Sequence, residues 1–65
     1  MRYLLRIFNC NDQRASKDIE KLKKHFIKNY LKVGEKVEFR EENGVIYIYI
    51  DESGWGIIEP LEEEI

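Results

Sequence analysis

One histidine and one cysteine are the side chains of this sequence best suited to acid–base or nucleophilic chemistry. A catalytic histidine needs an oriented partner and a cleft, and His25 has only Asn29 one helical turn further on. A nucleophilic cysteine needs a basic neighbour, and Arg14 is the one base close to Cys10 in the sequence. We therefore predict no catalytic residue and no enzyme. The alternative is a small hydrolase or thiol enzyme that uses His25 or Cys10.

The sequence also has no pattern typical of a bound metal or cofactor. One cysteine and one histidine do not complete a zinc site. The glycines in residues 53–56 do not precede a predicted helix, as the glycines of a phosphate-binding loop do. The acidic residues 62–64 are expected to form a solvated tail rather than a cation site. We predict no metal and no cofactor.

Five lysines recur every three or four residues and share one face of a predicted helix: Lys17, Lys21, Lys24, Lys28 and Lys32. The simplest interpretation is a solvated outer face, opposite to the apolar stripe of the helix. The more specific hypothesis is a docking surface for an acidic partner. Phosphate groups or a carboxylate-rich protein, including the acidic tail of a second copy, would fit it.

Charge is divided between the two halves of the chain. Residues 1–33 contain nine basic and three acidic side chains, and residues 34–65 contain two basic and ten acidic ones. This uneven distribution of charge affects how the protein surface interacts with charged partners. The net charge of −2 disfavours nonspecific nucleic-acid binding. No stretch approaches the ~20 apolar residues of a membrane span, and the lone cysteine fits a reducing compartment. We expect a cytoplasmic protein without membrane contact.

The predicted elements are a strand, a helix and a hairpin. Residues 2–9 alternate as a strand does, with Tyr3, Leu5 and Ile7 on one side. Turn formers in residues 9–13 end this strand. We expect a helix with Ser16 as N-cap and a stop at Lys32 and Gly34. Its predicted apolar stripe consists of Ala15, Ile19, Leu22, Phe26 and Tyr30.

Asn43 and Gly44 form the strongest short hairpin signal, because a type I′ turn needs two residues that tolerate positive φ. The turn predicts a register that runs from Glu42 opposite Val45 to Lys36 opposite Asp51. In that register one face collects five apolar side chains, which are Val37, Phe39, Ile46, Ile48 and Ile50. Residues 45–50 are apolar on both faces, and this favours a central strand.

These elements predict a small α+β sandwich in which one helix packs on an antiparallel three-stranded sheet. In the predicted order 2-3-1, the strand at 45–50 lies between the other hairpin strand and the strand at 2–9. Residues 55–59 form a short fourth strand in one version of this fold, and Pro60 restricts its continuation to a sheet edge. Residues 1–59 then make one domain, and residues 60–65 make an acidic tail.

The sheet face away from the helix is predicted to carry Leu4, Phe8, Val45, Tyr47 and Tyr49, flanked by Arg2, Arg6 and Arg40. An apolar patch of this kind tends to be covered. Three candidates could cover it: a second chain, Trp55 together with the C-terminal tail, or a nucleic acid whose bases stack on the aromatic rings.

The hypothesis that follows is a non-enzymatic protein-interaction module. We expect a homodimeric regulator or inhibitor, of the kind that phages and mobile elements encode, which also binds an unidentified protein. Its expected interface residues are Leu4, Phe8, Arg40, Tyr47, Tyr49 and Trp55. The alternative is a nucleic-acid-binding domain that uses the lysines of the helix or the arginines and tyrosines of the sheet.

Overall fold

The hairpin around Asn43 and Gly44 forms as its turn chemistry dictates. In the computed structural model, which describes residues 2–61, these two residues have φ values of 53° and 80°. They join β3 (Val37–Glu42) to β4 (Val45–Ile50). The pairs run from Glu42 opposite Val45 to Val37 opposite Ile50, so the predicted register is confirmed.

The single helix of the described chain is α1 (Ile19–Tyr30), and its start differs from the prediction. Asp18 is the N-cap, because its Oδ1 accepts a hydrogen bond of 3.0 Å from the Glu20 N–H. Ser16, the predicted cap, acts one step earlier, where its hydroxyl oxygen accepts from the Asp18 N–H at 3.1 Å. The helix ends at Tyr30 with Leu31 as C-cap.

The first strand, β1 (Arg2–Ile7), does not lead directly into the helix. The chain turns back over residues 8–12 and forms β2 (Gln13–Ser16), which pairs antiparallel with β1 from Tyr3–Ser16 to Arg6–Gln13. Ala15 therefore lies in β2 and is exposed, so its predicted place in the helix stripe is wrong. The four residues of β2 are mostly polar and lack the β-branched or aromatic types that mark strands, and this explains why the strand was missed.

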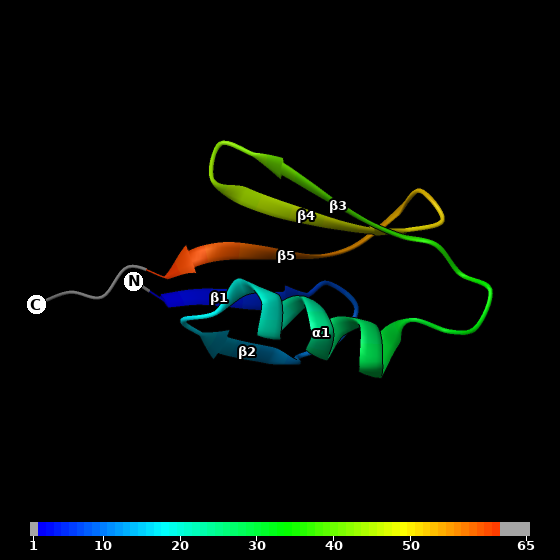
Figure 1. Ribbon diagram of the computed structural model, residues 1–65, viewed down its shortest axis with the longest axis horizontal. Coiled ribbons are helices and arrows are strands. Elements are labelled where there is room, and N and C mark those ends of the chain that lie inside the picture. Colours follow the sequence, from blue (N-terminus) through cyan, green and yellow to red (C-terminus); the bar gives the residue numbers. More distant parts are fainter. Residues whose placement is uncertain (1, 62–65) are drawn as a thin grey trace, which may run out of the picture.

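The last strand, β5 (Ser53–Leu61), occupies the centre of the sheet. It pairs antiparallel with β1 on one side and with β4 on the other, which gives the order β2-β1-β5-β4-β3 (Figure 1). The α+β class is confirmed, but the three-stranded sheet of order 2-3-1 is wrong, because β5 separates β4 from β1. Residues 62–65 of the predicted acidic tail lie outside the described residues.

A tight turn explains how β5 reaches this position. Asp51 and Glu52 have φ values of 48° and 70°, and Ile50 pairs with Ser53 directly across them. Two successive positive-φ residues are what a two-residue hairpin turn needs. The composition of residues 51–54 predicts a turn, and the structure confirms one at Asp51 and Glu52. Because glutamate has no preference for positive φ, the sequence does not identify it as a two-residue hairpin turn. Pro60 is accommodated because the pairing with β4 begins at Ile58, so β5 has only β1 beside it at Pro60.

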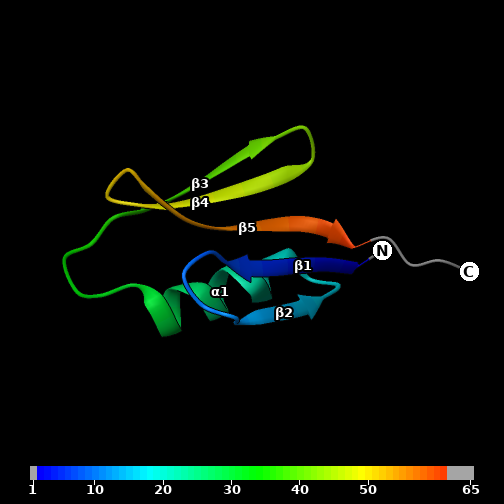
Figure 2. The same ribbon diagram turned by 180° about the vertical axis from the view of Figure 1, so that it is seen from behind.

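The core lies between α1 and one face of the sheet. It consists of eight buried side chains: Leu5, Ile7, Leu22, Phe26, Ile46, Ile48, Ile50 and Ile58. Each fully buried side chain of this size contributes about 1.5–3 kcal/mol relative to an exposed one. Figure 2, seen from behind, shows the other face of the sheet with no described element over it. Nowhere in residues 2–61 is there a helix with the length and apolar character that a membrane crossing requires.

A substitution at Gly56 tests the observed strand order. A Cβ at Gly56 would lie 2.5 Å from the carbonyl oxygen of Arg6, because β1 and β5 approach closely there. Gly56→Ala is therefore expected to destabilise the protein by about 1–3 kcal/mol, as overpacked cores do, in urea denaturation. Gly54→Ala in the same strand is the control. A Cβ there meets its nearest atoms at 3.9 Å, so we expect a change within about 0.5 kcal/mol. Equal effects of the two changes would contradict the observed pairing.

Candidate functional site

The open face is the side of the sheet away from α1, and it collects the predicted interface residues from different strands. Along β1, β3, β4 and β5, the strand register places on it Arg2, Leu4, Arg6, Glu38, Arg40, Glu42, Val45, Tyr47, Tyr49, Ile57, Glu59 and Leu61. Phe8, just after β1, joins them, because a Cβ on Gly54 would lie 3.9 Å from the Phe8 ring and 4.0 Å from the Tyr49 ring. The prediction that Leu4, Phe8, Val45, Tyr47 and Tyr49 share one face is therefore confirmed, whereas the β5 residues of this face were not predicted.

Apolar side chains on the open face are covered to very different degrees. Ile57 is only 7% exposed, between its cross-strand neighbours Arg6 and Tyr47. Phe8 is 56% exposed, which is high for a large aromatic side chain. Tyr47 and Tyr49 are half-buried. The face thus has a packed centre and an exposed aromatic residue at one end.

Two ion pairs between described residues lie on the open face, whereas Glu42 of the same face has no ion pair to a described residue. Arg6 Nε lies 3.4 Å from Glu59 Oε1, across the β1–β5 pairing. Arg40 pairs with Glu38 on β3, and the Arg40 guanidinium carbon lies 4.8 Å from the centroid of the Tyr49 ring. The bond to Glu38 and its negative charge raise the pKa of Arg40. The face therefore offers aromatic and apolar area among these ion pairs.

Trp55 is not brought to this face with the other predicted interface residues. It lies at a bulge where the register between β4 and β5 shifts, since Ile48 pairs with Gly56 and Tyr49 with Gly54. Its ring is partly buried and packs against the core residues, and its carbonyl oxygen accepts a 2.9 Å hydrogen bond from the Phe8 N–H. Trp55 thus packs with the core residues instead of lying on the open face.

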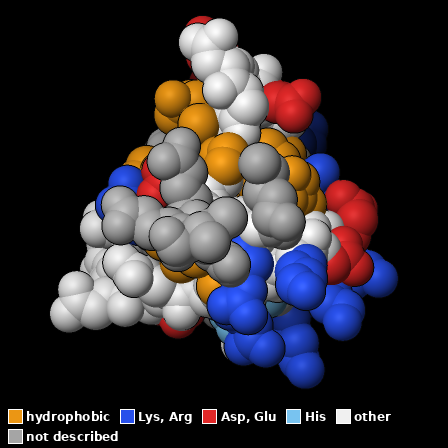
Figure 3. Space-filling view, turned by 90° about the vertical axis from the view of Figure 1, so that its left-hand side faces the viewer, with side chains coloured by type: hydrophobic (Ala, Val, Ile, Leu, Met, Phe, Trp, Pro, Cys, Tyr) orange, Lys and Arg blue, Asp and Glu red, His pale blue; other side chains and the backbone are white. Residues whose placement is uncertain are grey.

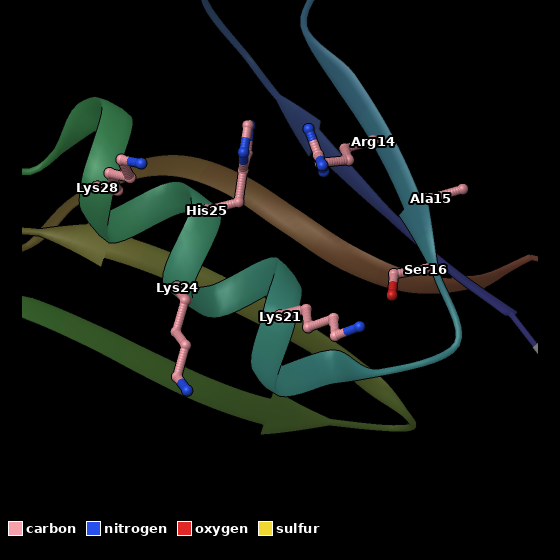
Figure 4. Close-up of a pocket in the computed structure, with 7 residues that line it drawn as sticks. All are labelled: Arg14, Ala15, Ser16, Lys21, Lys24, His25 and Lys28. Carbon is pink, nitrogen blue, oxygen red and sulfur yellow. The ribbon is translucent and has the colours of Figure 1, made fainter.

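A second candidate site lies between α1 and β2 on the helix side of the sheet (Figure 4). We call it the basic groove. It is a depression of about 440 Å³, lined by Arg14, Ala15, Ser16, Lys21, Lys24, His25 and Lys28. Figure 4 shows Arg14 and His25 side by side in the gap, Lys21 directed toward Ser16, and Lys24 directed to the other side of the helix. From the end of the molecule, the Lys and Arg side chains gather on one lower side (Figure 3).

The cations of the basic groove differ from those of the open face because they lack counter-ions. Within residues 2–61, no carboxylate oxygen lies within 4.0 Å of the charged groups of Arg14, Lys21 or Lys28. Lys23, by contrast, points to another side of α1, where it lies 3.4 Å from Glu20 Oε2 and over the Phe39 ring. The groove is thus a concave surface of one charge sign.

The predicted row of lysines is divided by the real helix ends. Lys21, Lys24 and Lys28 lie on α1 and border the basic groove. Lys17 lies between β2 and α1, and Lys32 follows the C-cap. Arg14 joins the groove from β2 instead, although no pattern in the sequence linked it to the lysines. Its place depends on the β1–β2 pairing, which the sequence did not indicate.

A network of polar side chains connects the C-terminal half of α1 to the turn before β2. The Tyr30 hydroxyl donates a hydrogen bond to Asp12 Oδ2, and Cys10 Sγ lies 3.7 Å from the same hydroxyl. His25 Nε2 lies 3.7 Å from Asp12 Oδ2. The Asn29 amide donates to His25 Nδ1 at 3.2 Å and to the His25 carbonyl oxygen at 2.8 Å.

Electrostatics in this network favours an ionised Asp12. The hydrogen bond from Tyr30 is the main cause, and His25 and Arg14 add to it, so the pKa of Asp12 lies below its usual value. The same hydrogen bond raises the pKa of Tyr30. No pattern in the sequence indicates that Asp12 and His25 meet, because the turn into β2 is what brings Asp12 to the helix.

This arrangement is not that of a nucleophile and its base. His25 Nδ1 is engaged by Asn29, and Nε2 has no hydrogen-bond partner in the described part of the chain. Cys10 contacts the Tyr30 hydroxyl instead of the imidazole. Nucleophilic catalysis needs the two groups within hydrogen-bond reach. In residues 2–61 we also find no group of three or more His, Cys, Asp or Glu side chains placed to hold a metal ion.

Comparison with protein-family models, curated proteins and solved structures found no match for this chain.

The Asp12 network gives the stability of the protein a defined pH dependence. A carboxyl with a lowered pKa stabilises the folded state above its unfolded-state pKa, and that stabilisation is lost as the pH falls through the folded-state pKa. Asp12→Asn should therefore be less stable than the wild type near pH 7, and the difference should close below about pH 4.

Urea denaturation over a pH series measures this difference. Glu42→Gln is the control, since it removes one exposed carboxylate with no ion pair to a described residue. A gap for Asp12→Asn that stays constant down to low pH would contradict the proposed ionic role of Asp12.

Proposed function

We propose that this protein is a non-enzymatic interaction module that forms a homodimer through its open face. The single observation that carries the proposal is the aromatic surface around Phe8, Tyr47 and Tyr49, which no described element covers. Aromatic residues and arginine are the residue types that dominate binding hot spots. Phe8 is 56% exposed at the end of this surface, and Arg40 lies over the Tyr49 ring.

The charge pattern supports a second copy as the occupant. In a two-fold interface the same patch meets itself, so unpaired like charges would repel. On the open face, Arg6 is paired with Glu59 and Arg40 with Glu38, so these four charges can meet a second copy without an excess of one sign. Glu42, at the end of β3, adds one carboxylate to this face. The same glutamates would face phosphate groups as like charges, and this disfavours nucleic acid as the ligand of the open face.

The non-enzymatic part of the proposal is supported by the geometry of His25 and Cys10. The imidazole is held by Asn29 and faces Asp12, and the thiol contacts Tyr30. We infer that the module acts as a regulator or inhibitor by binding a protein partner. We place it in a reducing compartment such as the cytoplasm, because its only cysteine is an exposed free thiol.

Sedimentation velocity tests the homodimer. The wild type is expected to sediment as a dimer at a concentration of about 50 µM, which corresponds to a dissociation constant in the micromolar range or below. Phe8→Lys should weaken the dimer by about 2 kcal/mol, roughly thirtyfold in Kd, because it places a charge among the aromatic anchors.

Val33→Lys is the matched control, since Val33 is fully exposed and lies in the loop between α1 and β3. It adds the same charge away from the open face and should leave the dimer unchanged. A wild type that sediments as a monomer, or an equal effect of both substitutions, would overturn the proposed interface.

A further inference from the structure

We propose that the basic groove binds the phosphodiester backbone of a single-stranded nucleic acid. This site lies on the helix side of the sheet, and the proposed dimer interface lies on the opposite side. The proposal therefore goes beyond the homodimer and does not depend on it.

The first support is charge without compensation in a concave surface. Arg14 comes from β2 and the lysines from α1, so cations line both walls of a depression of about 440 Å³. Among residues 2–61, no acidic side chain lines this depression. Clefts lined by one sign of charge concentrate field lines and raise the local concentration of ligands of the opposite sign.

Asp12, the acidic residue of the network beside the groove, already interacts with other side chains. Asp12 accepts the hydrogen bond of Tyr30 and faces His25 Nε2 at 3.7 Å. Its charge acts on Arg14 only at longer range, since the two groups are more than 4.0 Å apart. The guanidinium of Arg14 therefore remains available to an oxyanion, for which its planar set of donors is well suited.

The second support is the spacing of the cations along the groove. Lys21 and Lys28 are seven residues apart on α1, which corresponds to about 10 Å along the helix axis at 1.5 Å per residue. A single phosphate ion could contact only one end of such a row. A chain that carries a charge at every nucleotide could contact Lys21 and Lys28 together, with Arg14 on the opposite wall.

Two further side chains of the groove, Ser16 and His25, add a hydrogen-bond donor and a ring surface. The Ser16 hydroxyl oxygen accepts from the Asp18 N–H, so its own proton is free to be donated to a phosphate oxygen. His25 lines the groove with its side chain 21% exposed. An imidazole ring in this position offers a stacking surface for an unpaired base. This favours a single strand, whose bases are accessible.

Fluorescence anisotropy with a labelled single-stranded RNA or DNA of about twelve nucleotides tests the proposal. We expect micromolar binding in about 50 mM salt, and a plot of log affinity against log salt with a slope of roughly −2 for about three contacted phosphates. Lys21→Glu and Arg14→Glu, on the two walls, should each weaken binding by about tenfold.

Lys36→Glu is the matched control for Lys21→Glu. Both substitutions change the net charge equally, but Lys36 lies before β3, beside Asp51 and Glu52. It should weaken binding by less than about twofold. Circular dichroism checks that all three variants fold, and sedimentation shows whether the dimer is retained, so that failure of this site and failure of the open face are seen separately.

Several outcomes would overturn the proposal. One is the absence of binding in about 50 mM salt. Another is an equal loss for Lys36→Glu and Lys21→Glu, which would reduce the effect to net charge. Displacement of the oligonucleotide by polyglutamate at the same concentration of charge would instead assign the groove to an acidic protein segment. Displacement by inorganic phosphate at that concentration would assign it to a single small anion.

Discussion

The close approach of β5 to β1 at Gly56 is the contact on which the rest of the sheet depends. β5 joins two hairpins, β1–β2 and β3–β4, which have no direct pairing with each other. A side chain at position 56 would meet the Arg6 carbonyl oxygen at 2.5 Å, so only glycine allows this approach without movement of a strand. With β5 in place, Ile58 completes the core beneath α1 and Ile57 packs on the other side. A single helix of 12 residues then covers one face of a five-stranded sheet, and the open face follows from this mismatch.

The parts of the fold that could be predicted are those specified by neighbouring residues. Asn43 and Gly44 determined the register of β3 and β4, and the spacing of Leu22 and Phe26 identified the buried side of α1. The strands that were missed or misplaced depend on weaker signals. The turn at Asp51 and Glu52 has positive φ without a glycine, and β2 has only four mostly polar residues. Their positions are decided by backbone pairing with β1 and β4, which is not encoded in any local pattern.

The same distinction applies to the two candidate sites. The alternation of residues 2–8 and 45–49 was enough to place Leu4, Phe8, Tyr47 and Tyr49 on one face. It could not reveal that Arg6 would be neutralised by Glu59, because this pair crosses from β1 to β5, and the pairing of these strands was not predicted. Nor could the lysine spacing bring Arg14 and His25 together, since that proximity arises only when β2 pairs with β1 beside α1.

The strand order also places the basic and acidic parts of the sequence at opposite edges of the sheet. β2 and β3 are the two edges of the sheet, so the basic groove lies at one edge and the acidic β3, with Glu38, Glu41 and Glu42, lies at the other. Because the open face is on the opposite side of the sheet from α1, a dimer formed through it would leave both basic grooves on its outer surfaces. Two grooves in one such dimer would bind a long polyanion more tightly than either groove alone, since the second contact becomes intramolecular. Self-association through balanced charges and polyanion binding through unbalanced ones are therefore compatible in this fold, and each depends on a different set of side chains.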